Sequence, residues 1–163
     1  MTRPIRQPTL LYKLTRDGYG ASTFHSKCDG KSNTVTIIKT NSNYVFGAYT
    51  AAMWKSDGTY TYGYDTTAFI FSLRRNGISY NEKYMVRDPS FAIGNYDNWG
   101  PTFGEADSDI YLTLRDGGYI GHTNFGNSYS LPAGYSYGQE KTKSYLAGSY
   151  SGWIVSEVEV FQL

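Results

Sequence analysis

The alternation of hydrophobic and polar residues is clearest between residues 34 and 50. Two runs rich in β-branched and aromatic residues, 34–40 and 44–50, flank the polar cluster Asn41-Ser42-Asn43. Asn and Ser are common in tight turns, because their side chains hydrogen-bond to nearby backbone groups. The pattern therefore predicts a β-hairpin, and its strands are apolar enough to lie at the centre of a sheet.

Period-two alternation predicts further strands along the chain. Residues 110–114 alternate cleanly, and in the last strand, 154–161, Ile154, Val158 and Val160 are expected to point inward, with Glu157 and Glu159 on the other face. Other strands are predicted at 10–14, 67–73, 84–86, 90–93 and 145–150. A helix is predicted at about 19–28, with Ser22 as its cap, and a turn at Asn76-Gly77. Long loops are predicted at 54–66, 95–104 and 122–144. Strand number and spacing predict a mainly β fold: a two-sheet antiparallel β-sandwich with one or two short helices.

Length and composition agree with one domain. The chain has 163 residues, which suffice for a core without disulfides or metals, and its 17 tyrosines and 18 glycines suit pleated strands and turns. Residues 1–9 carry two prolines and two arginines. We expect them to form a flexible arm or a linker remnant, and we expect residues 10–163 to form the domain.

Net charge and cysteine content limit the classes of partner and the cellular compartment that we expect. The net charge of +1 gives no global field for nucleic acid or an anionic membrane. The one cysteine excludes an intrachain disulfide, and no segment has the pattern of a leader or a membrane span. These features predict a cytoplasmic protein that neither binds nucleic acid nor inserts into a membrane.

Several motifs occur in an order that resembles one known family. A Cys28-Asp29-Gly30 segment precedes the Ile37-Ile38-Lys39 strand, which is followed by 44–49, Tyr-Val-Phe-Gly-Ala-Tyr; later motifs are 68–73, 101–104, 121–122, 125–127 and 153–161. From about Leu10 to Phe161 the chain resembles the TLDc domain of the oxidation-resistance proteins. Many members have a glycine run after the Phe-Gly of 103–104, whereas this chain has an acidic segment, 105–109.

The resemblance implies a TLDc-like sandwich that acts as a non-enzymatic protein-interaction domain. It implies binding to subunits of the vacuolar-type proton-pumping ATPase, regulation of that pump, and a role in resistance to oxidative stress. The positions that match family motifs are Gly47, Gly104, Gly121, Glu157 and Glu159, which are the candidate partner-binding residues; each glycine alone is better explained by a requirement of folding. TLDc domains often follow other modules, so this domain is compatible with a longer chain that carries other domains.

His25 and Cys28 are the most obvious catalytic candidates. They lie three residues apart on the predicted helix, but a nucleophilic cysteine also needs a thiolate and an oxyanion site. A small buried cysteine is the preferred interpretation. His122 could join them in a metal site only with a fourth ligand. Common phosphate-binding, hydrolase and dinucleotide motifs are absent from the sequence, so we expect no enzyme activity and no cofactor.

Charged and tyrosine-rich segments leave one alternative open. Glu105, Asp107, Asp109 and Asp116 could bind Ca²⁺ or serve as paired catalytic carboxylates, although a solvated acidic loop is preferred. The cluster Arg74-Arg75, Lys83 and Arg87 could meet an acidic partner surface, although a solubilising hairpin end is preferred. Loop tyrosines could stack on sugars; they are Tyr60, Tyr62, Tyr64, Tyr129, Tyr135 and Tyr137. The alternative function is therefore a lectin-like or Ca²⁺-binding module that uses the tyrosine-rich loops and residues 105–116.

Overall fold

The computed structural model describes residues 7–105, 107–115 and 117–163. Among these residues the fold is mainly β, as the sequence predicts. The elements are, in order, β1 (Thr9–Lys13), α1 (Leu14–Asp17), α2 (Ala21–Cys28), β2 (Thr34–Thr40), β3 (Val45–Thr50), β4 (Thr61–Gly63), β5 (Phe69–Arg75), β6 (Ile78–Met85), the 3-10 helix η1 (Pro89–Phe91), β7 (Ile93–Asn95), β8 (Trp99–Phe103), β9 (Ile110–Arg115), β10 (Gly118–His122), α3 (Glu140–Lys143) and β11 (Ser151–Gln162). Because residues 1–6 lie outside the described part of the chain, the expected arm at 1–9 stays a prediction.

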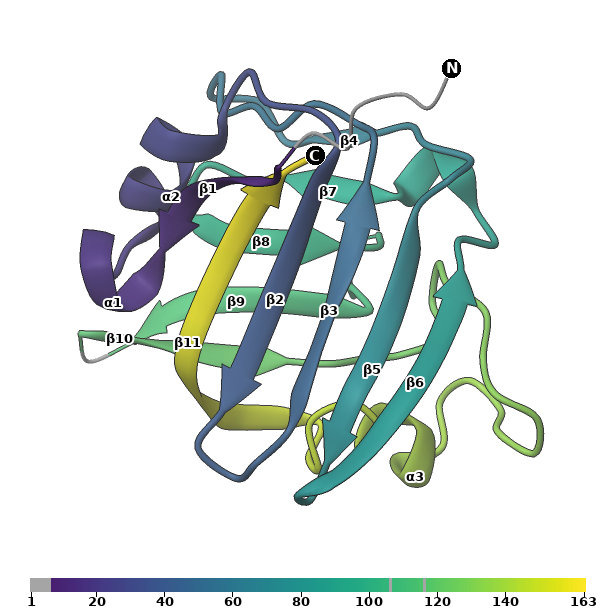
Figure 1. Cartoon of the computed structure of the whole chain (residues 1–163). Helices are drawn as coiled ribbons and strands as arrows, with labels where there is room; N and C mark the ends of the chain where they lie inside the picture. Colours follow the sequence, from purple (N-terminus) through teal and green to yellow (C-terminus); the bar gives the residue numbers. More distant parts are fainter. Residues whose placement is uncertain (1–6, 106, 116) are drawn as a thin grey trace, which may run out of the picture.

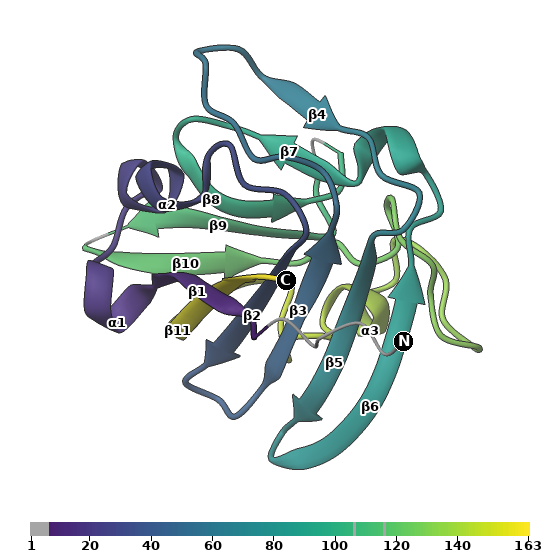
Figure 2. The same cartoon turned by 45° about the horizontal axis from the view of Figure 1, so that its top comes forward.

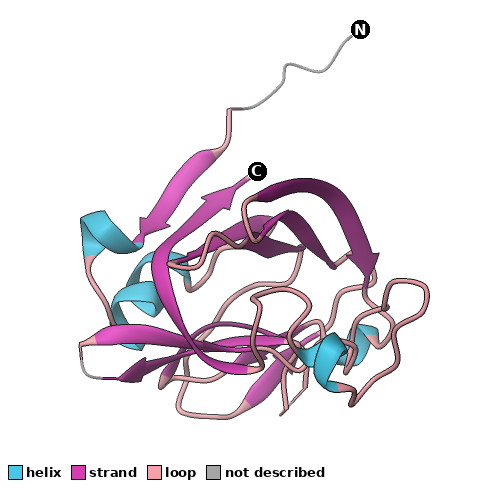
Figure 3. Cartoon of the chain, turned by 90° about the horizontal axis from the view of Figure 1, so that it is seen from below, coloured by secondary structure: helices cyan, strands magenta, loops and turns pink. Residues whose placement is uncertain are grey.

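The strands form two antiparallel layers that share strand β11. The first layer has the order β6-β5-β3-β2-β11, with β1 also paired to β11, and the second has the order β11-β10-β9-β8. In Figure 1 the first layer stands in front and the strands of the second layer run across behind it. Figure 3 shows the two layers from below as separate planes. The predicted sandwich is confirmed. Strands β4 and β7 pair in a small additional sheet, seen at the top of Figure 2.

The hydrophobic core lies between the two layers. Strands β2, β3 and β5 contribute Ile38, Phe46 and Ile70, which are fully buried, and the opposite layer contributes Leu112 and Tyr119. Burying one such side chain contributes about 1.5–3 kcal/mol. The predicted 34–50 hairpin is therefore confirmed as a central, two-stranded part of the core.

Strand β11 changes its inward-facing set partway along its length. Its pairing with β2 shifts register between Val155 and Glu157, which places a bulge at Ser156. Trp153 and Val155 are buried before the bulge and Val158 after it, whereas Ile154 is 55% exposed. The prediction that Ile154 points inward is wrong, because one extra residue exchanges the faces of a strand with period two.

Helix α2 is shorter than predicted. It begins at Ala21 with Gly20 as its N-cap, and no side chain caps it, so the prediction that Ser22 caps the helix is wrong. Phe24 and Cys28, four residues apart, are buried on its inner face. Within the described residues, no helix is long and apolar enough to cross a membrane.

Several segments differ from their sequence-based assignment. Residues 84 and 85 end the longer strand β6, the predicted strand 90–93 is replaced by η1 and the start of β7, the predicted loop 95–104 contains strand β8, and 145–150 forms turns instead of a strand. Strand β8 includes Gly100 and Pro101, which normally interrupt a strand. The pairing of β8 with β9 shifts register between Trp99 and Thr102, and this irregularity accommodates the proline.

Candidate functional site

The outer surface of the first layer faces away from the second layer. Residues opposite one another on neighbouring strands form rows across it: Phe161, Val35, Tyr49 and Phe69 in one row, Glu159, Ile37, Gly47, Phe71 and Lys83 in the next, and Glu157, Lys39 and Val45 in the third. We call these residues the outer sheet face. The second layer covers only the opposite, inner face of these strands (Figure 3).

A groove runs over the outer sheet face along strand β2. One part, of about 450 Å³, is lined by Lys13, Ile37, Lys39, Val45, Ser156, Glu157 and Glu159. A second, apolar part is lined by Pro8, Val35, Ile37, Phe161 and Leu163. Both parts are lined by Ile37, so they lie next to each other along strand β2.

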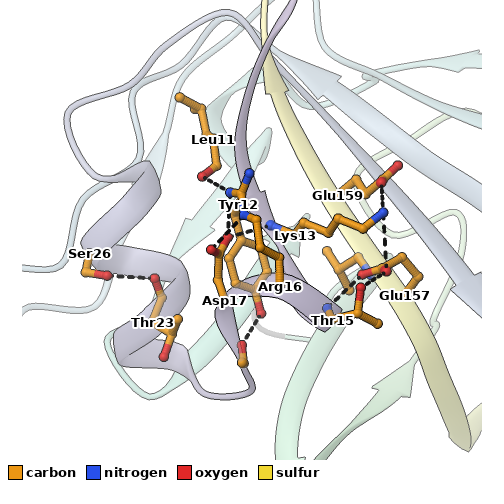
Figure 4. A network of polar contacts seen from close by, with 12 residues as sticks. Leu11, Tyr12, Lys13, Thr15, Arg16, Asp17, Thr23, Ser26, Glu157 and Glu159 are labelled. Carbon is orange, nitrogen blue, oxygen red and sulfur yellow. Dashed lines mark hydrogen bonds and ion pairs between the residues drawn. The ribbon is translucent and has the colours of Figure 1, made fainter.

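Glu157 and Glu159, two candidate partner-binding residues, point outward as predicted and are held by the N-terminal segment (Figure 4). The Lys13 ammonium pairs with Glu159 and lies 3.6 Å from the Glu157 carboxylate. The hydroxyl of Thr15 donates a hydrogen bond to Glu157 at 2.5 Å. Partial burial alone would raise the pKa of Glu157, but hydrogen bonds from Thr15 and Val158 and the charge of Lys13 lower it below its ordinary value. Both carboxylates are thus fixed in position at the rim of the groove.

The candidate glycines each meet a steric requirement of the fold. A Cβ at Gly47 would lie 1.9 Å from the carbonyl oxygen of Thr36, and one at Gly121 would lie 2.0 Å from the Trp153 indole. At Gly104 the backbone has φ 101°, which favours glycine. Gly47 lies on the outer sheet face, whereas Gly104 and Gly121 belong to the second layer and its loop. Their role in partner binding remains a prediction.

The acidic segment is organised around one buried carboxylate. Asp109 is fully buried and accepts hydrogen bonds from the backbone amides of Gly126 and Ser128, each at 2.7 Å. Burial raises the pKa of Asp109 to about 7, although these amides favour the charged form. The sequence offered no signal that distinguished this aspartate from its neighbours. The Asp109 side chain therefore connects the loop at 126–128 to the start of β9 by hydrogen bonds.

Glu105 and Asp107, the other described carboxylates of this segment, have different surroundings. Asp107 accepts a hydrogen bond from the side-chain amide of Asn124 at 2.6 Å, and Glu105 is exposed. Asp116 lies outside the described residues. In the described part of the chain, no three His, Cys, Asp or Glu side chains gather as a metal site would require.

His25 and Cys28 point to different surroundings. Cys28 is buried in the core, and burial raises its thiol pKa to about 12, so the reactive thiolate is disfavoured. The His25 ring contacts the Asp29 carboxylate at 2.7 Å and the carbonyl oxygen of Tyr96 at 3.1 Å. The hydroxyl of Ser56 bonds to Asp29 and not to the imidazole. This Asp, His and Ser set therefore lacks the hydrogen bond from the serine to the histidine that activates a nucleophile.

Tyrosines of the predicted recognition loops have different environments. Tyr60, Tyr64 and Tyr137 are exposed, whereas Tyr129 is fully buried and donates a hydrogen bond to the carbonyl oxygen of Ala92 at 2.6 Å. Tyr62 receives a hydrogen bond from the hydroxyl of Tyr96. Tyr60 and Tyr64 flank strand β4, whereas Tyr137 belongs to the 122–144 segment, so the exposed tyrosines come from two segments of the chain. The lectin-like alternative stays a prediction.

An aromatic row on the second layer escaped the sequence analysis. The rings of Trp99 and Tyr111 lie 4.8 Å apart and those of Tyr111 and His122 lie 4.5 Å apart, with nearly parallel planes. Burial lowers the pKa of His122. Because the ring faces cover one another, the row contributes cross-strand stacking and does not offer a flat surface to a sugar.

The predicted basic cluster is divided between two faces of the sheet. Arg75 turns inward, where its guanidinium pairs with Glu82 at 2.6 Å and lies over the Tyr80 ring. Lys83 stays on the outer sheet face, with its ammonium 4.0 Å from the centre of the Phe69 ring. Arg87 donates hydrogen bonds to carbonyl oxygens of the 126–127 loop. Arg74 is exposed and lies opposite Val45, so Arg74 and Lys83 are the members of this cluster on the side of the outer sheet face.

Comparisons with known proteins add a family and one relative. The sequence model of one protein family, described as TLDc domain, matches residues 2–163. The chain is also 36% identical over 81 residues to a protein of Drosophila melanogaster named GTPase-activating protein skywalker. That match covers 43% of this chain and 14% of the relative, so the chain corresponds to a small part of the relative's length.

Proposed function

This chain belongs to the TLDc domain family, since the family match extends over residues 2–163, and from this premise we propose that it is a non-enzymatic protein-interaction domain. Its proposed partner is the vacuolar-type proton-pumping ATPase, whose assembly or activity it would regulate in the cytoplasm. The pump is the partner implied by the family motifs of the sequence. The GTPase-activating activity named for the Drosophila relative is not part of the proposal, because the chain covers 14% of that protein.

One observation carries the proposal of an interaction domain. Three positions that match family motifs, Gly47, Glu157 and Glu159, lie on the same open outer sheet face. The groove beside them combines apolar and charged side chains, and Lys13 and Thr15 hold its two carboxylates in place. A rigid, partly apolar surface with fixed charges is suited to recognising another protein, because little side-chain entropy is lost on binding.

Binding to the purified catalytic sector of the pump tests the proposal directly. The domain is immobilised, binding of the sector is measured by biolayer interferometry, and ATP hydrolysis by the sector is followed with and without the free domain. We expect saturable binding and a changed rate of hydrolysis. A folded domain that neither binds the sector nor changes its rate would contradict the proposal.

The proposed role in oxidative-stress resistance follows from pump regulation and not from thiol chemistry. Cys28 is buried, its pKa is raised to about 12, and it is the single cysteine of the chain. A lone buried thiol is a poor redox catalyst. In cells that depend on this domain for peroxide survival, Cys28→Ser should therefore preserve survival. Loss of protection by a Cys28→Ser domain that still binds the pump would overturn this part of the proposal.

A further inference from the structure

The central strands of the first layer are apolar on both faces. Ile37 lies next to the buried Ile38, and Phe71 next to the buried Ile70, yet Ile37 and Phe71 are on the outer sheet face and half-buried. Strands that are apolar on both faces are typical of sheets covered on both sides. In the described residues, the second layer covers one side only (Figure 3). The outer sheet face thus has the composition of a surface that is covered by something else.

The shape of the groove limits what can cover it. It follows β2 over the five residues from Val35 to Lys39, or about 13 Å at the rise of a strand. Gly47 lies opposite Ile37, and the space that a Cβ would occupy there is closed by the Thr36 backbone and the Phe71 ring. Two to three turns of an α-helix, at about 5.4 Å a turn, match this length. Helices commonly pack against a sheet in the layered architectures of proteins.

The charges around the groove indicate whether its partner carries acidic or basic side chains. In the described part of the chain, neither Lys39 nor Lys83 has a carboxylate partner, whereas the carboxylates of Glu157 and Glu159 are already near the ammonium of Lys13. The unneutralised ammonium of Lys39 therefore lines the groove itself, whereas that of Lys83 lies on β6, three strands from β2 across the outer sheet face. An occupant with carboxylates there would gain complementary charge.

We propose that the groove along β2 binds an amphipathic α-helix of a protein partner, with an apolar stripe on Ile37 and its neighbours and acidic residues toward Lys39 and Lys83. This inference rests on the proposed interaction function and specifies the partner segment. An anionic membrane is a less suitable occupant, because Glu157 and Glu159 form the opposite rim of the groove.

A displayed library of random 16-residue peptides provides the probe. Peptides are selected on the wild-type domain after depletion on a domain carrying Ile37→Ser and Lys39→Glu. We expect enriched peptides with apolar residues at i, i+3, i+4 and i+7 and with Asp or Glu beside them, which become helical on binding by circular dichroism. Failure to enrich any such peptide, or enrichment of extended or basic peptides, would overturn the proposal.

Single variants then locate the binding site of one synthesised, fluorescently labelled peptide. Ile37→Ser, Lys39→Glu and Lys83→Glu should each weaken binding at least about fivefold, which corresponds to roughly 1 kcal/mol. The matched controls Ile154→Ser and Lys27→Glu, at exposed positions outside the groove, should leave binding unchanged. Equal effects of the groove variants and the controls would refute the location. The melting temperature of every variant is measured, so that a loss of binding is not confused with unfolding. If Ile37→Ser unfolds, the two surface lysine variants still test the binding site.

Two further measurements separate this inference from the proposed function and from membrane binding. If helical acidic peptides are enriched on the groove but the domain does not bind the pump, the result supports the helix-binding groove and contradicts the proposed pump binding. If the pump binds equally to wild type and to Lys39→Glu, the groove inference falls and the pump proposal stands. Co-sedimentation of the domain with phosphatidylserine vesicles that depends on Lys39 and Lys83 would contradict the helix as the occupant of the groove and would indicate a membrane surface instead.

Discussion

At the scale of single residues, Asp109 combines complete burial with a structural task. Its carboxylate accepts the amide hydrogens of Gly126 and Ser128 and so fixes the 126–128 loop. Asp109→Ala leaves both amides without a partner, at about 1–3 kcal/mol each. We expect a loss of about 2–5 kcal/mol in the free energy of unfolding, measured by urea denaturation. Glu105→Ala, on the exposed side chain nearby, is the control; a loss no larger than that of the control would contradict this role.

The ionisation of Asp109 predicts a pH dependence of stability. Its pKa of about 7 in the folded protein lies above the unfolded value of 3.8. Between about pH 4 and 7 the native state retains a proton that the unfolded chain has released, so this contribution is complete below pH 4 and is lost as the pH rises through 7. Asp109→Asn removes the ionisable group. We expect the stability of wild type relative to Asp109→Asn to fall by about 2–3 kcal/mol between pH 5 and pH 8. A stability difference between wild type and Asp109→Asn that does not change with pH would contradict a raised pKa of Asp109.

Two glycines test whether family motif positions are structural. An alanine Cβ at Gly47 would collide with the Thr36 backbone oxygen, whereas at Gly100 the nearest atoms are ring atoms of Tyr119 at 3.2 Å. Overpacking of this kind costs about 1–3 kcal/mol, and more when backbone must move. We expect Gly47→Ala to lower stability by about 3 kcal/mol or more and Gly100→Ala by about 1 kcal/mol, in thermal melts. Similar values for both would contradict the steric argument.

At the scale of elements, Glu82 connects the β5–β6 hairpin to the segment before β11. Its carboxylate accepts hydrogen bonds from Arg75 and from the hydroxyls of Tyr84 and Tyr145. Charge-assisted hydrogen bonds are among the stronger polar interactions, but this side chain is partly exposed. Glu82→Gln should therefore cost about 1–2 kcal/mol, and Glu140→Gln close to none. Hydrogen exchange should locate the loosening at Tyr145; exchange that changes at a distant strand instead would exclude the proposed connection.

The sequence predicted elements well where the local pattern and the tertiary structure agree. The 34–50 hairpin and the Asn76-Gly77 turn, whose residues both have positive φ, were predictable because turn residues and alternation coincide. Strand β8 was missed because Gly100 and Pro101 interrupt its pattern, and tertiary pairing overrides this local signal. The bulge at Ser156 was equally invisible, since an inserted residue in a strand has no compositional signature.

At the scale of the whole molecule, the candidate site could be predicted in part. Alternation alone placed Glu157 and Glu159 on the outer side of β11. The groove could not be predicted, because it joins residues of β1, β2, β3 and β11 whose neighbourhood depends on strand order. Strand order is set by long-range pairing, which a single sequence does not specify. For the same reason the basic cluster of the β5–β6 hairpin was read as one surface, although the fold divides it.

The carboxylates at the rim provide the test that joins site and partner. The double variant Glu157→Lys, Glu159→Lys removes both partners of Lys13 and reverses the charge of the rim. We expect a small decrease in melting temperature, because ion pairs at the surface, here half-buried, contribute little, together with a loss of pump binding of at least tenfold. The control Glu105→Lys, Glu140→Lys changes the net charge equally at exposed positions away from the outer sheet face. If the rim variant is folded and binds the pump as tightly as this control, Glu157 and Glu159 lie outside the contact, and the partner must use another surface of the sandwich.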